Sequence, residues 1–320
     1  MGTLMVGASL RSVGVVGAGL VGSAWAIVFA RAGVAVRAFD ASEDVRRTAA
    51  KRIRASLEDM AKAGLVDDSV DAICSRVTVV DDLRAAIAEA DYVQESVFER
   101  VEEKRAVSEA IGALIRDDAV VGSSSSGIPA SAFSEHAPRR QRFLIAHPVN
   151  PPHLVPVVEL VPTPWTDPEI LPWLRGVMQS VGQAPIVVNR EIEGFILNRL
   201  QGVLLKEAWA LFEEGYASAA DIDLTVSQGL GLRWSFMGPF ETIDLNAPGG
   251  VDDYARRLGP LYQSIGESRS HPRPWSPELI EKARAERRAA LPREKLAERS
   301  AWRDRRLMAL VAHRRSQPSE

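Results

Sequence analysis

The sequence predicts an α/β protein in which a doubly wound parallel sheet is followed by an all-helical C-terminal domain. Three observations support this prediction. Short apolar runs alternate with helical segments, a glycine-rich turn joins the first run to the first helix, and strand signals stop after Asn189. The natural boundary separates a domain over residues 1–189 from a domain over residues 190–320.

The first three elements form a βαβ unit. Ser12–Val16 is a short apolar run, Ala18–Ala32 has helical periodicity, and Val34–Phe39 is again strand-like. Charged helical segments follow over residues 43–66 and 68–75. This order is typical of parallel strands joined by crossover helices.

Further apolar runs predict the remaining strands, with helical patterns between them. Because strands that alternate with helices form parallel sheets, we expect helices on both faces of the sheet. The predicted strands are Val77–Val80, Tyr92–Glu95, Val120–Gly122, Phe143–Ala146 and Ala184–Val188, the last of which closes this domain.

From Glu193 onward the pattern is mostly helical. The segment Leu200–Phe212 has apolar residues around much of its circumference, and a single helix layer could not cover them all. We therefore expect this half to form a homodimer interface and to close the active site. The charged tail, Glu286–Arg315, is interpreted as a solvated amphipathic helix in preference to a nucleic-acid-binding arm.

Composition excludes several classes of function. Of the 320 residues, 46% are hydrophobic and 25% charged, and a net charge of -3 gives no electrostatic footprint for nucleic acid or an anionic membrane. No run of about 18 apolar residues indicates a membrane span. The single cysteine, Cys74, excludes an intrachain disulfide and a cysteine-based zinc cluster. We expect a cytoplasmic protein without a metal site.

The motif GAGLVG, residues 17–22, follows the first predicted strand and opens a helix. In this context it predicts a dinucleotide-binding turn. Gly17 permits the tight turn, Gly19 lets a pyrophosphate approach the backbone, and Gly22 allows the helix to pack closely on the strand. The free N–H groups at the helix start, where Leu20 and Val21 lie, favour the phosphate charge.

An acid, Asp40, follows the second predicted strand. Its carboxylate would accept hydrogen bonds from the adenosine ribose hydroxyls and repel a 2′-phosphate. NAD is therefore the expected cofactor, in preference to NADP.

The stretch FLIAHPVNPP, residues 143–152, places one imidazole at the end of an apolar run. Such a histidine is by default a buried core residue that bonds to a carbonyl group. Pro148, however, cannot continue a strand ladder, so His147 lies where the strand ends and the chain turns outward. Ligands bind at that edge of open parallel sheets, which makes His147 a candidate catalytic residue.

Two further polar residues interrupt apolar segments. Glu159 lies inside the strand-like segment Val155–Val161, where a buried carboxylate needs a cation or a donor. His147 would supply one, because a carboxylate fixes the imidazole tautomer and stabilises the imidazolium. Asn198 interrupts the apolar helix start over residues 193–200, and a substrate oxygen is one possible hydrogen-bond partner for it.

Polar residues also follow two other predicted strands. Glu99 and Lys104 come after Tyr92–Glu95, where charge at a helix start or helix surface is the ordinary explanation. Four serines, residues 123–126, could form a solvated turn or a helix cap, and no GxSxG elbow indicates a nucleophile. A hydride-transfer site nevertheless needs hydroxyl donors at this edge.

Together these segments resemble the L-3-hydroxyacyl-CoA dehydrogenase superfamily, which implies a Rossmann-type sheet. The resemblance rests on GAGLVG, QESVFE, the serine-rich loop, AHPVNPPHLVPVVELVP and EGFILNRL, and it extends from about residue 12 to about residue 312. The segments GLGLRWSFMGP, ETIDLNA and LAERSAWRD resemble the lambda-crystallin and L-gulonate 3-dehydrogenase branch.

The resemblance implies roles for individual residues. His147 matches the family's catalytic base, and Glu159 matches its acidic partner. Ser126 and Asn198 match the polar groups that hold the substrate hydroxyl or the product carbonyl. Ser125 is a rival for Ser126, because adjacent serines leave the register open.

Two other positions also take roles from the resemblance, and a third, Arg233, follows from the chemistry of a free acid. Glu99 and Lys104 match positions near the nicotinamide-side ribose of NAD. Acyl-CoA enzymes of the superfamily usually have a shorter connection where this chain has LRWSF, residues 232–236, which argues against a CoA thioester. For a free hydroxy acid, the guanidinium group of Arg233 would suit the carboxylate; an interface or surface arginine is the alternative.

These expectations lead to NAD-dependent oxidation of the 3-hydroxyl group of an L-3-hydroxy acid, with L-gulonate giving 3-dehydro-L-gulonate. The alternatives are an L-3-hydroxyacyl-CoA such as 3-hydroxybutyryl-CoA, L-carnitine, or a non-catalytic dinucleotide-binding protein of crystallin type. The polar set of Ser126, His147, Glu159 and Asn198 argues against the last, because bulk packing does not need buried polar partners.

Overall fold

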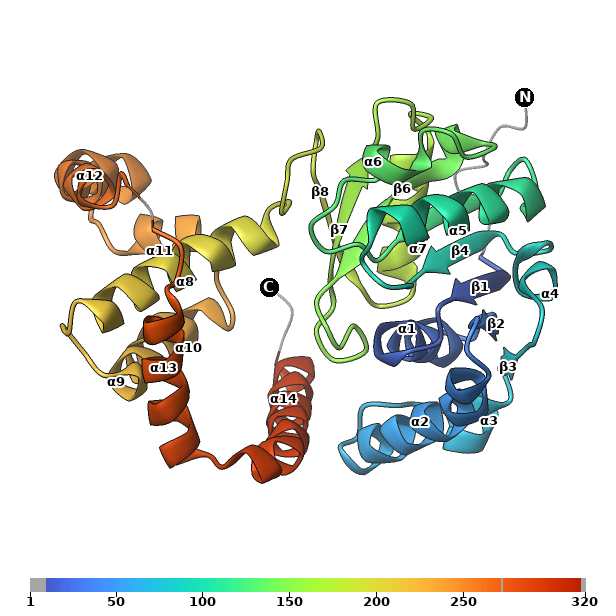
Figure 1. Cartoon of the computed structure of the whole chain (residues 1–320), viewed down its shortest axis with the longest axis horizontal. Coiled ribbons are helices and arrows are strands. Elements are labelled where there is room, and N and C mark those ends of the chain that lie inside the picture. The colour runs from blue at the N-terminus through green and yellow to red at the C-terminus, as the bar shows by residue number, and fades with distance from the viewer. Residues whose placement is uncertain (1–9, 272, 318–320) are drawn as a thin grey trace. The chain divides into compact units, whose positions relative to one another are not determined.

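The computed structural model describes residues 10–271 and 273–317. These residues form two compact units, drawn in Figure 1. The first contains the chain up to Arg199 together with the residues from Ala301 onward, and the second contains Leu200–Ser300. This division differs from the predicted boundary between residues 189 and 190, because Phe195 and Met308 pack into the cores of the sheet-containing unit.

The first unit is built on one eight-stranded sheet with the strand order β3-β2-β1-β4-β5-β6-β7-β8. Strands β1 to β6 are parallel, which confirms the predicted architecture for most of the sheet. The strands are β1 (Ser12–Val16), β2 (Ala35–Phe39), β3 (Val77–Val79), β4 (Tyr92–Glu95), β5 (Val120–Ser123), β6 (Phe143–Pro148), β7 (Val157–Pro162) and β8 (Ala184–Val187).

The last two strands run opposite to the other six. β7 pairs antiparallel with β6, and β8 pairs parallel with β7. Only residues 149–156 connect β6 to β7, which is too short for a parallel crossover of a dozen or more residues. Pro148 belongs to β6 and lies opposite Val158, so the strand continues one residue beyond His147 instead of ending there.

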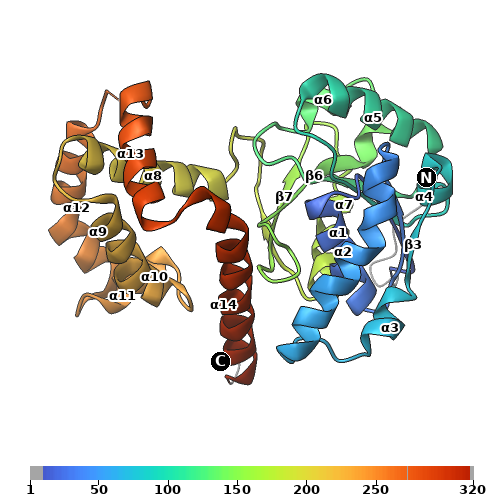
Figure 2. The ribbon, with the colours of Figure 1, turned by 60° about the horizontal axis from the view of Figure 1, so that its bottom comes forward.

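In the central strands, alternate residues bury apolar side chains on opposite faces of the sheet. In β4, Tyr92 packs with Trp25 and Phe29 on one face, and Val93 packs with Ile111 on the other. The helices lie in two layers (Figures 1 and 2). The first face carries α1 (Leu20–Arg31), α2 (Glu43–Lys62), α3 (Val70–Cys74) and α7 (Ile170–Ser180), and the second carries α4 (Leu83–Ile87), α5 (Val101–Leu114) and α6 (Ser131–Ser134).

The last helix, α14 (Leu296–Ser316), is not wholly solvated as the sequence suggested. Its residue Met308 is buried in the core that α1 and α2 share, and Arg315 donates to the carbonyl oxygen of Leu65 at 3.1 Å. A hollow of about 240 Å³ lies beside α1, with lining residues from α2, α14 and the β6–β7 connection.

The second unit is helical, as predicted. Its helices are α8 (Leu197–Glu213), whose first turn belongs to the first unit, α9 (Ala219–Leu224), a π-helix (Thr225–Leu230), α10 (Gly231–Trp234), α11 (Pro239–Leu245), α12 (Gly250–Ser268) and α13 (Pro277–Ala290). Trp209 and Trp275 stack with their ring centroids 4.6 Å apart, and Arg269 forms salt bridges with Glu207 and Glu214. Across residues 10–271 and 273–317, no helix has both the length and the apolar character that a membrane span requires.

Candidate active site

The strand order places a topological switch point at the carboxyl ends of β1 and β4. These strands are neighbours, and the chain proceeds from them toward opposite edges of the sheet. Ligands of doubly wound sheets bind at such a switch point. Gly17 follows β1 and Ser96 follows β4, and a Cβ atom on Gly17 would lie 2.6 Å from the carbonyl carbon of Ser96.

Each of the three glycines of the turn is needed for a different structural reason. Gly17 has a φ of +92°, a backbone conformation that glycine adopts readily. A Cβ atom on Gly22 would lie 1.8 Å from the carbonyl oxygen of Gly17, so helix and turn could not pack with a larger residue. A Cβ atom on Gly19 would meet no heavy atom within 4 Å. The space above Gly19 suits a pyrophosphate, and the turn therefore fits the expected dinucleotide.

The start of α1 is also suited to an anion. Helix α2 is capped by the side chain of Ser42 and has two acids in its first turn, whereas α1 begins after Gly19 with no capping side chain and no acid. Leu20 is 72% exposed and Val21 is half-buried. The first N–H groups of α1 therefore keep their capacity to bind a phosphate.

Asp40 fastens the glycine turn to the end of β2, a role that the sequence did not predict. Its Oδ2 accepts a hydrogen bond from the N–H of Ala18 at 2.8 Å, and its Oδ1 accepts one from the N–H of Ser42 at 2.9 Å. Each carboxylate oxygen has a second lone pair. Asp40 can therefore hold the turn and still accept hydrogen bonds from a ribose.

His147 and Glu159 form a buried pair on β6 and β7. Nδ1 of His147 lies 2.7 Å from Oε2 of Glu159, and the imidazole is 5.7 Å from the ring of Phe195, measured between centroids. An ionised carboxylate can only accept, so Nδ1 carries the proton and the neutral imidazole has its lone pair on Nε2. The pair predicted from the sequence is thus brought together, with the base nitrogen defined.

The other oxygen of Glu159 is bound by the start of α8. Oε1 accepts hydrogen bonds from the N–H groups of Ile196 at 2.8 Å and Leu197 at 3.0 Å. Burial by itself would raise the pKa of Glu159, but the hydrogen bonds from His147, Leu197 and Ile196 hold that pKa below its ordinary value. Glu159 is therefore ionised at neutral pH although its side chain is fully buried.

Phe195 is a further residue of this site, and sequence reasoning missed it. It is fully buried and has a φ of +50°, which is unusual for a residue with a side chain. Together with Gly194, at a φ of +74°, it turns the chain so that the next two N–H groups reach Glu159. The sequence feature that could have indicated this turn is Gly194, which directly precedes an apolar helix start.

Ser126 and Asn198 are also brought together. Nδ2 of Asn198 donates to the carbonyl oxygen of Ser126 at 2.5 Å, and the hydroxyl of Ser126 donates to Oε2 of Glu99. Oε1 of Glu99 accepts from the N–H groups of Ser126 and Gly127, each at 2.8 Å. Burial would raise the pKa of Glu99, but hydrogen bonds from Ser126, Gly127 and Ser125 lower it from 4.5 to about 2.

The two rival serines lie in different environments. Ser125 is 2% exposed, and its hydroxyl is bonded to Glu99 Oε1 at 2.9 Å and to the carbonyl oxygen of Ile128 at 3.0 Å. Ser126 is only half-buried. Since a substrate needs an accessible hydroxyl, the geometry favours Ser126 over Ser125.

Lys104 differs from the expected cofactor ligand. Its side chain is 1% exposed, and Nζ lies 2.9 Å from each carboxylate oxygen of Glu95 and 3.4 Å from Oγ of Ser123. Glu95 also accepts from the N–H of Val97 at 2.7 Å and from the hydroxyl of Ser123 at 2.5 Å. All three ammonium hydrogens have partners inside the protein, so Lys104 stabilises the loops that follow β4 and β5 and is not free to bind a cofactor.

Sequence reasoning missed Glu95, although an acid inside a predicted strand was the same signal that identified Glu159.

Arg233, the candidate carboxylate ligand, belongs to the second unit. It lies in α10, directly after the π-helix, and its side chain is exposed. Helical turns of the π type are rare and occur frequently at functional sites.

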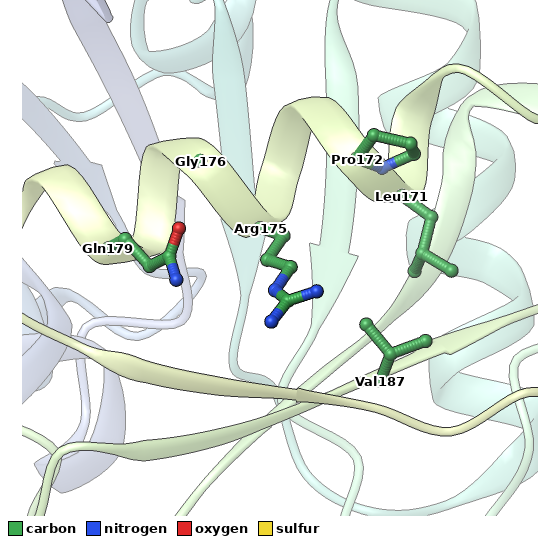
Figure 3. Close-up of a pocket in the computed structure, with 6 residues that line it drawn as sticks. All are labelled: Leu171, Pro172, Arg175, Gly176, Gln179 and Val187. Carbon is green, nitrogen blue, oxygen red and sulfur yellow. The ribbon is translucent and has the colours of Figure 1, made fainter.

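One hollow of the first unit is not part of this site. It has a volume of about 460 Å³ and lies between α7 and β8, where Arg175 and Val187 point toward the same space (Figure 3). The residues that line it are Leu171, Pro172, Arg175, Gly176, Gln179 and Val187. Helix α7 covers the face of the sheet opposite to that of His147 and Glu159.

The sheet carries a dinucleotide-binding turn and an imidazole that is held by a carboxylate. A nicotinamide-dependent dehydrogenase needs both, and the site therefore places the protein in that class. Comparison with known proteins specifies the family. Residues 12–192 match the NAD-binding domain of 3-hydroxyacyl-CoA dehydrogenase, and residues 194–291 match its C-terminal domain. The chain belongs to the 3-hydroxyacyl-CoA dehydrogenase family, which confirms the resemblance, the enzyme class and NAD as the cofactor.

Individual relatives cover most of the chain. The lambda-crystallin homolog of Homo sapiens is 35% identical over 96% of this chain and 97% of its own length. The L-carnitine dehydrogenase of Streptomyces coelicolor is 34% identical over 80% of each chain. Among solved structures, 5-formyl-3-hydroxy-2-methylpyridine 4-carboxylic acid 5-dehydrogenase, an NAD⁺-dependent dismutase, superposes with a TM-score of 0.80 at 28% identity, covering 96% of this chain and 98% of that one.

Proposed function

We propose that this protein oxidises the 3-hydroxyl group of a free L-3-hydroxy acid with NAD, and that L-gulonate, giving 3-dehydro-L-gulonate, is the substrate. The observation that supports the chemistry most directly is the bond from His147 Nδ1 to Glu159, because it leaves Nε2 as a base. Glu159 is buried and ionised, so it stabilises the imidazolium that forms when Nε2 takes a proton.

Each side chain of the site has a separate role in the proposed oxidation. His147 removes the hydroxyl proton, and Glu159 offsets the positive charge that develops on the imidazole. Ser126 and Asn198 hold the reacting oxygen, and Glu99 orients the serine loop through its hydrogen bonds. Bound NAD supplies the acceptor for the two electrons that the substrate carbon loses.

The turn over residues 17–22 would hold the cofactor. The open space at Gly19 and the uncapped start of α1, at Leu20 and Val21, suit the pyrophosphate. Gly17 and Gly22 give the turn its shape, and Asp40 would accept hydrogen bonds from the adenosine ribose.

The choice of L-gulonate, and of a free acid, rests on three features. The lambda-crystallin relative matches nearly the full length of the chain, whereas the L-carnitine dehydrogenase matches 80% of it. Arg233 supplies an exposed guanidinium group that suits a carboxylate, and it lies in the LRWSF segment, where acyl-CoA enzymes of the superfamily usually have a shorter connection. The name of the structural neighbour is also that of an enzyme of a free carboxylic acid.

Other substrates remain alternatives to L-gulonate. A 3-hydroxyacyl-CoA such as 3-hydroxybutyryl-CoA and L-carnitine would use the same His147 chemistry, and a crystallin-type role would use none. The test is NADH production, followed by absorbance, with L-gulonate, L-3-hydroxybutyrate, L-carnitine and 3-hydroxybutyryl-CoA. We expect the highest kcat/KM with L-gulonate. A higher value with the CoA thioester or L-carnitine would contradict the substrate, and no turnover with any 3-hydroxy compound would contradict the reaction.

We also propose that the second unit forms a homodimer with a second copy of the chain. Several large apolar side chains of this unit are exposed, among them Val203, Phe236, Phe240 and Leu245. Helix α8 buries only Phe212, and α12 buries no residue at all among those described. A two-fold partner would cover such surfaces, and C2 dimers are the commonest assembly.

A further inference from the structure

A series of hydrogen-bonded polar side chains leads from the core to the glycine turn. The hydroxyl of Tyr92 donates to Oε1 of Gln94 at 2.5 Å, and Nε2 of Gln94 lies 3.3 Å from the carbonyl oxygen of Ala146 and 2.8 Å from Oγ of Ser124. A carbonyl oxygen can only accept, so the amide nitrogen of Gln94 must face Ala146. Its second hydrogen is then directed at Ser124.

The hydroxyl of Ser124 is fixed by its neighbours. Its oxygen accepts from Nε2 of Gln94 and also from Nε1 of Trp25, at 3.2 Å, and an indole nitrogen can only donate. Two accepted hydrogens fill both lone pairs of a hydroxyl oxygen. The proton of Ser124 must therefore point to its remaining partner, Oγ of Ser96, at 2.8 Å.

Ser96 stands at the outer end of this series. Its N–H donates to the carbonyl oxygen of Val16 at 2.7 Å, and its backbone lies against Gly17, so the residue belongs to the switch point. Its hydroxyl oxygen accepts from Ser124 and is half-buried. Within residues 10–271 and 273–317, no protein atom accepts the hydroxyl proton of Ser96. Each donation polarises the next group in the series, which makes this last proton a better donor.

We propose that Ser96 is a cofactor-positioning residue whose hydroxyl donates to an acceptor oxygen of the bound dinucleotide, and that Tyr92, Gln94, Trp25 and Ser124 impose this direction from within the core. The proposal goes beyond the cofactor residues that the glycine motif identifies, because none of these five belongs to it. The acceptor is a pyrophosphate, ribose or carboxamide oxygen of the nicotinamide half of NAD, because β4 lies on the other side of β1 from β2, where Asp40 would hold the adenosine ribose.

The experiment compares ligand affinity in three proteins by calorimetric titration: the full-length chain, Ser96→Ala, and the control Ser180→Ala, which removes a hydroxyl bonded to a backbone oxygen at the end of α7. Ser96→Ala should bind NAD about tenfold more weakly, the effect of one lost hydrogen bond to a charged or strongly polar group. Its affinity for AMP should be unchanged, which shows that the glycine turn is intact.

ADP-ribose then locates the acceptor. Weaker binding of ADP-ribose to Ser96→Ala assigns the acceptor to a pyrophosphate or ribose oxygen, and unchanged binding assigns it to the carboxamide. Binding of NAD within about twofold of the parent chain would overturn the proposal.

A remote substitution tests the imposed direction. Trp25→Phe keeps an aromatic ring beside Phe29 but frees one lone pair of Ser124, so that Ser96 can donate inward instead of outward. We expect NAD affinity to fall several-fold, to a value between those of the parent chain and Ser96→Ala, while AMP affinity stays constant. Unchanged NAD affinity in Trp25→Phe, beside a loss in Ser96→Ala, would overturn the role of the buried series.

Discussion

His147 and Glu159 are direct cross-strand neighbours, because the antiparallel register of β6 and β7 pairs their Cα atoms. Residues opposite each other in such a pair project to the same face of the sheet, and here the imidazole and the carboxylate meet at 2.7 Å. A slip of one residue would turn Glu159 to the other face. The short β6–β7 connection therefore determines the geometry of the base.

Replacement of the base should separate catalysis from cofactor binding. We expect His147→Gln to lower kcat by about 10² or more, the usual effect of losing a general base, while NAD affinity stays nearly unchanged. Steady-state kinetics and NAD titration measure the two effects. His136→Gln, at an exposed position, is the control. Near-native turnover of His147→Gln would return His147 to the role of a core residue.

Asp40 should determine which cofactor is used. We expect the parent chain to prefer NAD over NADP by a wide margin, and Asp40→Ala to narrow that margin because the repulsion of a 2′-phosphate is lost. The ratio of kcat/KM for the two cofactors is the measurement. Asp81→Ala removes an exposed acid elsewhere and should leave the ratio unchanged. Equal use of both cofactors by the parent chain contradicts the assignment.

Glu99 should contribute stability that depends on pH. Because its pKa is lowered from 4.5 to about 2 in the folded chain, the contribution is complete above about pH 4.5 and is lost as the pH falls toward 2. Glu99→Gln should therefore lower the urea midpoint at pH 7, and the difference from the parent chain should shrink below pH 4.5. A difference that is constant with pH would show that the charge of Glu99 has no such effect.

The buried pair of Glu95 and Lys104 should be strongly coupled. Lys104→Met leaves an unpaired buried carboxylate, which should cost about 3–5 kcal/mol of unfolding free energy. The double variant with Glu95→Leu removes both charges and should lose much less. Urea unfolding measures each value. Lys62→Met breaks an exposed pair with Asp59 and should change stability by less than about 1 kcal/mol. If the double variant loses as much unfolding free energy as the two single variants lose together, the coupling is disproved.

Assembly should be visible in solution. We expect light scattering at micromolar concentration to give about twice the 34.9 kDa of one chain. Phe240→Glu places a charge in an exposed apolar region of the second unit and should shift the mass toward one chain, whereas Phe98→Glu, exposed in the first unit, should not. A measured mass of one chain for the parent protein would refute the proposed dimer.

Local patterns were sufficient for the fold class and the cofactor turn. The alternation of apolar runs and helical segments, and the spacing of Gly17, Gly19 and Gly22, depend on residues close in sequence, so they can be read without a structure. The same is true of His147 and Glu159 as polar residues in apolar runs. Their partnership was a correct hypothesis, because a buried carboxylate needs a donor.

Features that depend on distant segments could be decided only by the tertiary structure. The reversed direction of β7 and β8, the return of α14 to the sheet, and the burial of Lys104 against Glu95 all follow from packing between elements far apart in the chain. The burial of Ser125 is also a tertiary feature, since its hydroxyl is bonded to Glu99 and to the carbonyl oxygen of Ile128. Hydrogen-bond direction and strand register are properties of contacts, and a sequence pattern gives only the residues that are able to make them.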